Sequence, residues 1–425
     1  MYDKPRLLRP IGPPLGLYLR PGRNDHTPLT AVLAENRANL TGLVLDPCLK
    51  DRHEDLRVEA GQHGLETVLD PRTIELSTVG GIARSGVPRL PWAGETLPHT
   101  PDMLDGGAGD FLVEKIVATI IEGKYTAVLA PTHYLAAGAA GPWLEVDGRL
   151  TRKLRALLDA RGLRDVCIYY PLATTAKIFR HAAERAHLRV ALAALPIDAL
   201  WLRIHPFGTT ASGPLALRRY IDGCRDFHSL EVPLVAEHTG TVGVALLAFG
   251  AVGGIESGIT YGERYDINPL IKPPGDSNPF SPSPRVYVER LGTFLSRDQA
   301  DVLFSNRQMK SLFGCKVAGC CPRGAADMSA DPRRHFILRR VSEVATYSRP
   351  PEPVRAGIYL EEFLRPATDL ALRATRVAPE LDSTRKRLEG WRRTLGAMHQ
   401  QGAPSTFAVP PEGQRVQPRR RAVGE

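Results

Sequence analysis

Cysteine and long hydrophobic runs are scarce in this sequence. There are only six cysteines in 425 residues, too few for the disulfide framework of a small secreted protein. No apolar run approaches the roughly 20 residues that a membrane-spanning helix needs. Residues 1–14 contain no apolar signal core. We therefore expect a cytoplasmic protein that does not bind a membrane.

Several familiar catalytic motifs are also missing. No GxGxxG turn follows an apolar run, and the chain has neither an HExxH motif nor a phosphate-binding glycine loop. The formal charge, by contrast, is +9, which favours a polyanionic partner such as nucleic acid. Part of the excess lies in residues 415–421, so a basic tail on an otherwise neutral enzyme is the alternative.

The stretch 232–262 shows the plan of the fold. An apolar run ends at Glu237-His238, a small-residue helix follows, and a second apolar run stops at Glu256. This order is typical of a βαβ unit. In barrel enzymes the carboxyl ends of parallel strands hold the catalytic groups.

Similar units recur along the chain. Strands are predicted at residues 16–20, 41–45, 65–69, 125–130, 166–170, 200–204, 232–236 and 253–255. Helix-like segments follow all but the third closely. A doubly wound sheet also alternates strands and helices, but eight successive units favour a (β/α)8 TIM barrel.

The predicted organisation has three parts. Residues 1–262 form the barrel, with a long loop at about 73–110 that is typical of a lid or substrate-binding insertion. Residues 263–400 form a zinc-binding and helical C-terminal subdomain. Residues 401–425 are rich in Pro, Gln and Arg and are predicted to be a disordered basic tail.

Acidic and histidine side chains follow several of the predicted strands. Each alone is more often a cap or a buried hydrogen-bonding group than a catalyst. Together they would converge on one cavity at the barrel mouth, which indicates proton transfer or nucleophilic attack at a glycosidic carbon. The residues are Asp46, Asp70, Glu237, Glu256, His133, His205 and His238.

Three of the six cysteines lie together in a short, glycine-rich loop. Cys315, Cys320 and Cys321 are followed by His335, and three thiolates with one imidazole are ligands that a structural Zn²⁺ prefers. The spacing matches no common zinc finger, and adjacent cysteines seldom bind one ion. Packed thiols beside a surface histidine are therefore the alternative to a zinc site.

A barrel whose last strand ends in a carboxylate, followed by a cysteine-rich insertion, resembles the tRNA-guanine transglycosylase superfamily. The resemblance is most detailed over residues 232–343, where Thr239-Gly240-Thr241 is similar to the family's Gly-Thr turn. It implies that Glu256 is the nucleophile, that Asp46 or else Asp70 is the acid/base, and that the cysteine cluster binds zinc.

The sequence departs from this family in its substrate-reading part. The Asp-Ser-Gly-Gly-Phe-Gln segment is absent, the cysteine spacing is altered, and a glutamate replaces the nucleophilic aspartate. The leading hypothesis is therefore a DNA glycosylase that excises a modified base, leaves an abasic site and serves in phage defence. Glu237, His238, His205, His133 and Arg72 would line the base pocket, and Trp92 would stack on the flipped base.

Three alternatives stay open. A base-exchanging enzyme acting on tRNA would incorporate a free base, whereas a glycosylase would leave an abasic site. A barrel enzyme acting on a small sugar or carboxylic acid would bind nucleic acid weakly. A non-enzymatic, zinc-stabilised nucleic-acid-binding protein would not depend on the strand-end acids. The oligomeric state does not follow from the sequence.

Overall fold

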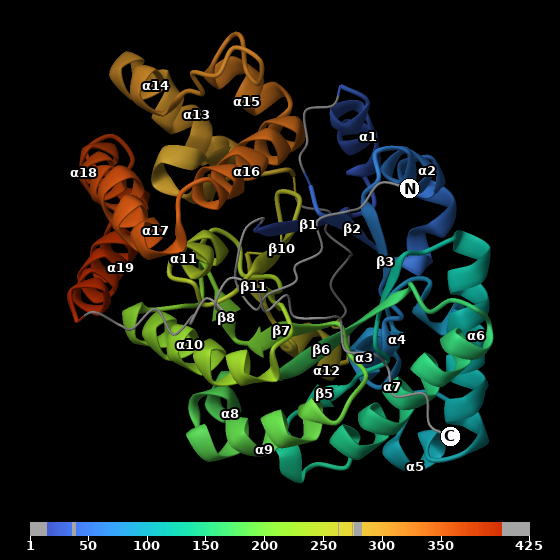
Figure 1. The fold of residues 1–425 in the computed structure, drawn as a ribbon. Helices are drawn as coiled ribbons and strands as arrows, with labels where there is room; N and C mark the ends of the chain where they lie inside the picture. The colour runs from blue at the N-terminus through green and yellow to red at the C-terminus, as the bar shows by residue number, and fades with distance from the viewer. Residues whose placement is uncertain (1–14, 36–39, 262, 274, 276–282, 402–425) are drawn as a thin grey trace.

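Eight parallel strands close into a barrel (Figure 1). The computed structural model describes residues 15–35, 40–261, 263–273, 275 and 283–401. The strands are β1 (Gly16–Arg20), β2 (Gly42–Leu45), β3 (Glu66–Leu69), β4 (Ala127–Leu129), β6 (Cys167–Thr175), β7 (Ala199–His205), β9 (Leu234–Ala236) and β10 (Gly254–Gly258). The barrel closes because β1 pairs with β10 and β4 pairs with β6, both in parallel. The predicted TIM barrel is confirmed.

Alternate strand residues fill the barrel interior. Tyr18, Tyr169 and Trp201 pack there with small and β-branched residues, separately from the core between strands and helices. The buried Glu66 carboxylate accepts hydrogen bonds from the hydroxyl groups of Tyr18 at 3.0 Å and Tyr169 at 2.5 Å. The interior is therefore a packed core, and a site is expected at the carboxyl ends of the strands, which form the barrel mouth.

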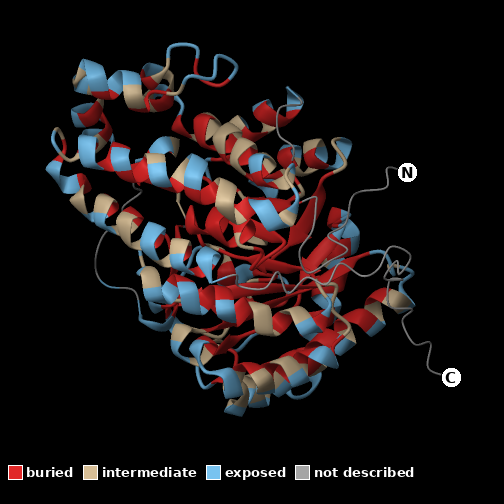
Figure 2. Cartoon of the chain, turned by 60° about the vertical axis from the view of Figure 1, so that its left-hand side comes forward, coloured by how far each residue is buried: buried red, intermediate tan, exposed pale blue. Residues whose placement is uncertain are grey.

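Helices surround the barrel (Figure 2). The surrounding helices are α1 (His26–Ala34), α2 (Glu54–Gln62), α6 (Gly107–Gly123), α7 (Trp143–Ala160), α8 (Ala176–Arg180), α9 (Ala182–Ala193), α10 (Pro214–Phe227) and α11 (Val242–Ala248). In the longer ones buried residues recur every three or four positions, as an amphipathic helix requires, whereas every residue of α11 is buried. Short 3₁₀ turns add η1 (Pro47–Arg52), η3 (Gly138–Ala140) and η4 (His228–Leu230).

The long loop predicted at 73–110 is a series of short helices, and α6 begins at its end. It contains α3 (Thr73–Leu76), α4 (Val79–Ile82), η2 (Val87–Arg89) and α5 (Pro101–Leu104). Gly80 lies against backbone carbonyls of α12 (Asn268–Ile271), so closely that a side chain at this position would clash with them. The loop after β3 therefore packs against the loop after β10.

Short strands outside the eight barrel strands form a small second sheet and an extension beside β6. β11 (Arg264–Tyr265) pairs with β8 (Phe207–Gly208), and β5 (Tyr134–Leu135) extends the sheet beside β6. The cysteine loop lies in a subdomain built from β12 (Val286–Val288), η5 (Glu289–Leu291), β13 (Thr293–Leu295), α13 (Arg297–Ser305), α14 (Arg307–Phe313), α15 (Ala325–Ala330) and α16 (Pro332–Ser348). β12 and β13 pair in antiparallel fashion.

The last helices pack back onto the barrel. They are α17 (Glu352–Ile358), the π-helix η6 (Tyr359–Leu364), α18 (Arg365–Ala374), η7 (Pro379–Leu381) and α19 (Asp382–Gln400). The Trp391 indole donates to the Ser212 carbonyl just before α10, at 3.2 Å. No helix among the described residues is long and apolar enough to cross a membrane. The predicted disordered tail lies almost wholly outside the described residues.

Candidate active site and candidate metal centre

Strand-end side chains meet at the barrel mouth around two arginines that the sequence analysis did not single out. Arg20 ends β1 and Arg203 lies near the end of β7. Arg20 donates from Nη1 to Asp70 Oδ2 at 2.6 Å, from Nη2 to Glu237 Oε1 at 2.5 Å, and from Nε to Glu256 Oε1 at 3.2 Å. One guanidinium therefore joins carboxylates from three strand ends.

Arg203 completes this network from the other side. Its Nη2 lies 3.0 Å from Asp70 Oδ2, and its Nε lies 2.5 Å from Glu237 Oε2. Burial raises the pKa of a carboxyl group, but Arg203 and Arg20 outweigh it and hold the pKa of Asp70 well below its usual range. The pKa of Glu237 is lowered for the same reasons. Both groups are ionised at neutral pH.

Asp46 forms a second, more open group. Its Oδ1 accepts from the Cys48 backbone at 2.9 Å, and its Oδ2 lies 3.2 Å from Arg72 Nη1. Arg72 adopts a left-handed φ of 59° and also pairs with Glu75 at 3.2 Å. The Asp46 side chain is 16% exposed, against 5% for Asp70. Of these two candidate acid/base groups, Asp46 is the more accessible.

Glu256 lies deeper than the sequence predicted. The apolar run was expected to stop at this residue, but Glu256 is the third residue of β10 and is fully buried. Its Oε2 accepts from the His238 backbone at 3.0 Å and lies 3.4 Å from His238 Nδ1. Burial lowers the pKa of His238, so its ring is neutral at physiological pH. The His238 side chain is 23% exposed, whereas that of Glu256 is fully buried.

Ligand atoms of Glu237, His238 and Glu256 lie within 4.8 Å of one another, close enough to bind a cation. Arg20, however, donates to both carboxylates. A guanidinium already supplies the positive charge that a metal ion would bring. This trio is therefore described as part of the ionic network.

The other predicted pocket residues are placed differently. His133 is fully buried, and its Nδ1 bonds to Asp147 at 2.6 Å. The His205 side chain is 15% exposed, with Nδ1 3.5 Å from Asp266 Oδ1. Trp92 is 1% exposed and donates to the Pro71 carbonyl at 2.8 Å. The prediction that Trp92 stacks on a base does not fit this position, because its ring belongs to the core.

The mouth has an excess of negative charge inside and positive charge on part of its rim. Inside, five carboxylates face three guanidinium groups: Asp46, Asp70, Glu75, Glu237 and Glu256 against Arg20, Arg72 and Arg203. Because His238 is neutral, this constellation has a net negative charge. Such a site stabilises positive charge that develops in a bound molecule.

Most exposed charged side chains of the rim lie on one half. Loops after parallel strands lie on the mouth side, and those after β10, β1, β2 and β3 are neighbours in the barrel. Among their described residues, these four loops carry seven exposed cations, Arg23, Lys50, Arg52, Arg84, Arg89, Arg264 and Lys272, against four exposed acids, Asp51, Glu95, Asp102 and Asp105. Two of the cations are already paired, Lys50 with Glu122 and Arg264 with Asp266. The segments after β4, β7 and β9 carry no exposed charged residue, whereas Lys177 and Arg180 are exposed on α8, directly after β6. We call the seven cations the basic arc.

The cysteine cluster has the geometry of a tetrahedral metal site. Cys320 Sγ and Cys321 Sγ are 3.6 Å apart and lie 3.5 and 3.3 Å from His335 Nδ1. The Cys315 ligand atom is within 4.8 Å of the others. Zinc–ligand bonds of about 2.0–2.3 Å at tetrahedral angles separate ligand atoms by roughly 3.5–3.8 Å. Both adjacent cysteines can therefore contribute to one site.

The surroundings of His335 also fit a metal ligand. Its Nε2 lies 3.0 Å from the Tyr287 carbonyl, which can only accept. The proton therefore lies on Nε2, and Nδ1 is free to coordinate, as in other metal-bound histidines. These four residues would hold a structural Zn²⁺.

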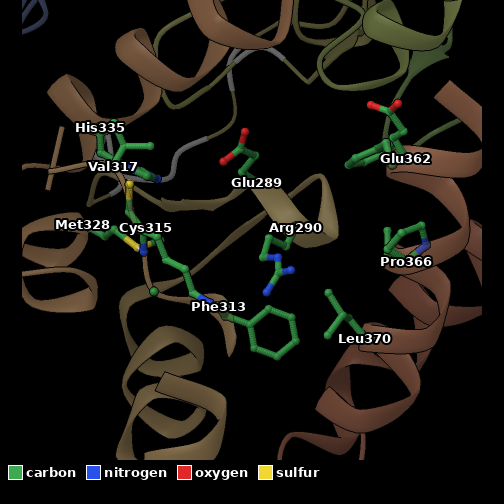
Figure 3. Close-up of a pocket in the computed structure, with 14 residues that line it drawn as sticks. Glu289, Arg290, Phe313, Cys315, Val317, Met328, His335, Glu362, Pro366 and Leu370 are labelled. Carbon is green, nitrogen blue, oxygen red and sulfur yellow. Dashed lines mark hydrogen bonds between the residues drawn. The ribbon is translucent and has the colours of Figure 1, made fainter. Parts of the chain in front are cut away.

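A cavity of about 390 Å³ opens between the cysteine loop and α18 (Figure 3). Cys315 and His335 form part of its wall, and Phe313, Arg290 and Leu370 line it further along. All its lining residues lie between 289 and 370. It is therefore separate from the barrel mouth.

The sequence matches no protein-family model and no curated protein. Solved structures that it resembles include a Penicillium canescens endo-1,4-beta-xylanase, at 10% identity and a TM-score of 0.38, over 56% of this chain and 81% of that one. A Bacillus endo-beta-1,4-mannanase catalytic domain gives 10% and 0.37, over 58% and 77%. A putative fructose-1,6-biphosphate aldolase from Coccidioides immitis gives 10% and 0.35, over 79% and 91%. TM-scores this low carry no argument about activity.

Proposed function

We propose that the protein is a barrel enzyme that breaks the N-glycosidic bond of a base in nucleic acid, with a modified base in DNA as the favoured substrate. The observation that carries the proposal is the charge pattern of the mouth. A net negative constellation lies inside a rim whose basic arc can contact phosphates. A polyanionic substrate with a cationic transition state matches both parts.

The chemistry follows from that match. Departure of a base leaves an oxocarbenium-like sugar, and carboxylates stabilise its positive charge. In the proposed mechanism Glu256 stabilises or attacks the sugar carbon, while Asp46 donates a proton to the leaving base and then activates water. Asp70 is the weaker candidate for the acid, because Arg20 and Arg203 both donate to it and its pKa is lowered.

A base must leave the stack to reach this depth. His238 is the most exposed group beside Glu256, with its ring stacked on Tyr265 at 6.0 Å. His238 and His205 therefore line the proposed base pocket together with Arg72. Glu237 and His133 are left out of the proposed pocket, because the side chain of each is fully buried.

The assignment follows the resemblance to tRNA-guanine transglycosylases in two features, the carboxylate on the last strand and the Cys3His cluster. In the proposal zinc supplies no chemistry at the mouth. It would hold the cysteine loop in shape, as structural zinc does.

The test is incubation with plain, hydroxymethylated and glucosylated duplex DNA, and separately with bulk tRNA, followed by mass spectrometry of released bases. We expect a base released from one modified DNA, with an abasic site left behind. Glu256→Gln should abolish release and Asp46→Asn should slow it at least about 100-fold.

A matched control is Glu389→Gln, because Glu389 lies on α19 and pairs with Arg385 one turn earlier on the same helix. This variant should keep full activity. Incorporation of a labelled free base into tRNA would replace the proposal by base exchange. Absence of release from every nucleic acid would overturn it and favour a small-molecule substrate.

A further inference from the structure

Helix α16 connects the cysteine cluster to the barrel mouth. Near its start Arg333 Nε pairs with Asp25 Oδ1 in the loop after β1, at 2.6 Å. Arg334 follows Arg333, and the next residue is His335, the histidine of the cysteine cluster. Two turns into the helix, Arg340 reaches the turn after β9. The helix therefore contacts loops on both sides of β10, the strand that carries Glu256.

Arg340 is the most constrained of these contacts. Its side chain is fully buried, and Nη2 donates to Thr241 Oγ1 at 3.1 Å while Nη1 lies 3.5 Å from the Gly240 carbonyl. Its guanidinium lies over the rings of Tyr287 and Phe336, 5.4 and 5.3 Å from their centroids. A buried cation with these partners holds the turn firmly, since hydrogen bonds from charged groups are stronger than neutral ones.

The turn that Arg340 holds is the one that follows Glu237 and His238. Gly240 has a φ of +64°, and an added Cβ would lie 2.6 Å from Thr209 Oγ1 and 2.8 Å from the Glu263 backbone. The turn thus has a tight, glycine-dependent shape. His238, two residues earlier, is left-handed at a φ of 53° and donates its backbone N–H to Glu256. A change in the turn would therefore alter the position of His238 relative to Glu256.

The same arginine is tied to the cysteine cluster. His335 bonds to the Tyr287 carbonyl, and the Tyr287 hydroxyl donates to Glu343 at 2.5 Å. Glu343 in turn lies 3.3 Å from Arg340 Nε. Tyr287 and Glu343, which both lie beside Arg340, are thus linked to His335 by hydrogen bonds.

We propose that Arg340 is a positioning residue that couples zinc binding at the Cys3His cluster to the shape of the turn 237–241 at the barrel mouth. Zinc fixes His335, His335 fixes Tyr287 and α16, and Arg340 transmits this order to the Gly240 carbonyl and the Thr241 hydroxyl. The inference does not depend on which bond the mouth breaks.

The test is hydrogen exchange of the full chain, followed by mass spectrometry, with and without removal of zinc by a chelator. Removing zinc from the unmodified protein should speed exchange in a peptide covering 236–246 at least about tenfold. Zinc-loaded Arg340→Met should show the same faster exchange, because methionine retains the apolar stem but cannot donate. Chelation of Arg340→Met should then add nothing further at 236–246, although residues 315–335 should still respond.

Arg339→Met is the matched control, because Arg339 pairs with Glu289 at 2.5 Å within the subdomain. It should leave exchange at 236–246 unchanged. A peptide covering 167–175 in β6 reports general unfolding. If this peptide also exchanges faster after chelation, the zinc-loaded Arg340→Met protein alone decides. The proposal is overturned by normal exchange at 236–246 in that variant, by additive effects of the substitution and chelation, or by a chain that takes up no zinc.

Discussion

Replacing Arg203 by methionine should destabilise the barrel in a pH-dependent way. The substitution keeps the length of the side chain but removes the hydrogen bonds to Asp70 at 3.0 Å and Glu237 at 2.5 Å. Arg20 alone then balances three carboxylates. The side chain of Glu237 is fully buried, so it cannot regain hydration in the folded protein.

The expected loss is large because removing one partner leaves a buried charge uncompensated. Such changes cost about 3–5 kcal/mol, and the remaining Arg20 contact places this one near the lower end. Since small domains are stable by about 5–15 kcal/mol in total, a loss of about 3 kcal/mol is easily measured. Adding Glu237→Gln to Arg203→Met removes the unpaired charge and should restore part of the loss.

The sign of the pH effect follows from the pKa shifts. In the unmodified protein the pKa values of Asp70 and Glu237 are lowered, so their contribution to stability is present above about pH 4 and is lost as pH falls further. In Arg203→Met, burial dominates at Glu237 and raises its pKa above the unfolded value. The variant should then regain stability relative to the unmodified protein as pH falls from 8 to 5.

Urea unfolding at pH 8 and pH 5, followed by tryptophan fluorescence, measures the free energy of unfolding of both proteins. Trp201 lies in β7 and is fully buried, so its emission should report the barrel. Arg218→Met on the surface of α10 is the control and should change stability by less than about 0.5 kcal/mol. A loss below about 1 kcal/mol for Arg203→Met, or an equal loss at both pH values, would refute the reasoning.

Three further predictions concern the barrel interior, the metal and the rim. Tyr18→Phe should cost about 1–3 kcal/mol in urea unfolding, because the buried Glu66 carboxylate loses a hydrogen-bond donor; an unchanged midpoint would contradict this. Elemental analysis should find one zinc per chain, lost in Cys321→Ala but retained in Cys224→Ala, whose thiol is buried elsewhere. Replacing Arg84 and Arg89 by alanine should reduce the salt dependence of DNA binding by about one phosphate contact each, whereas Arg385→Ala on α19 should leave the slope unchanged.

The barrel was predictable because its signals are local. Each strand is a short apolar run closed by a turn residue, and the run 16–20 coincides with β1. The short helices between 73 and 104 were not predictable, because one turn of helix shows no period. The burial of Trp92 was not predictable for a related reason. An aromatic residue in a glycine-rich loop looks exposed, and only tertiary packing buries it.

The candidate site was predictable in part. The strand-end acids follow from position, but Arg20 and Arg203 do not, because their partners lie on other strands. Glu256 was expected to end its strand, since a carboxylate usually interrupts an apolar run. The guanidinium of Arg20, brought beside it by closure of the barrel, allows the strand to continue to Gly258. The sequence did contain a signal, an arginine at the end of GLYLR (Arg20) and another within ALWLRIH (Arg203), both on largely apolar strands.

The pairing of β1 with β10 has a consequence for how the chain assembles. One edge of β1 must wait for a partner that is synthesised only after all the other barrel strands. Arg333 and Arg340, which contact the loops on either side of β10, emerge from the ribosome later still. The mouth is therefore the last part of the barrel to be completed during synthesis. A nascent chain that stops before α16 has every strand but lacks the contacts that hold its mouth in shape.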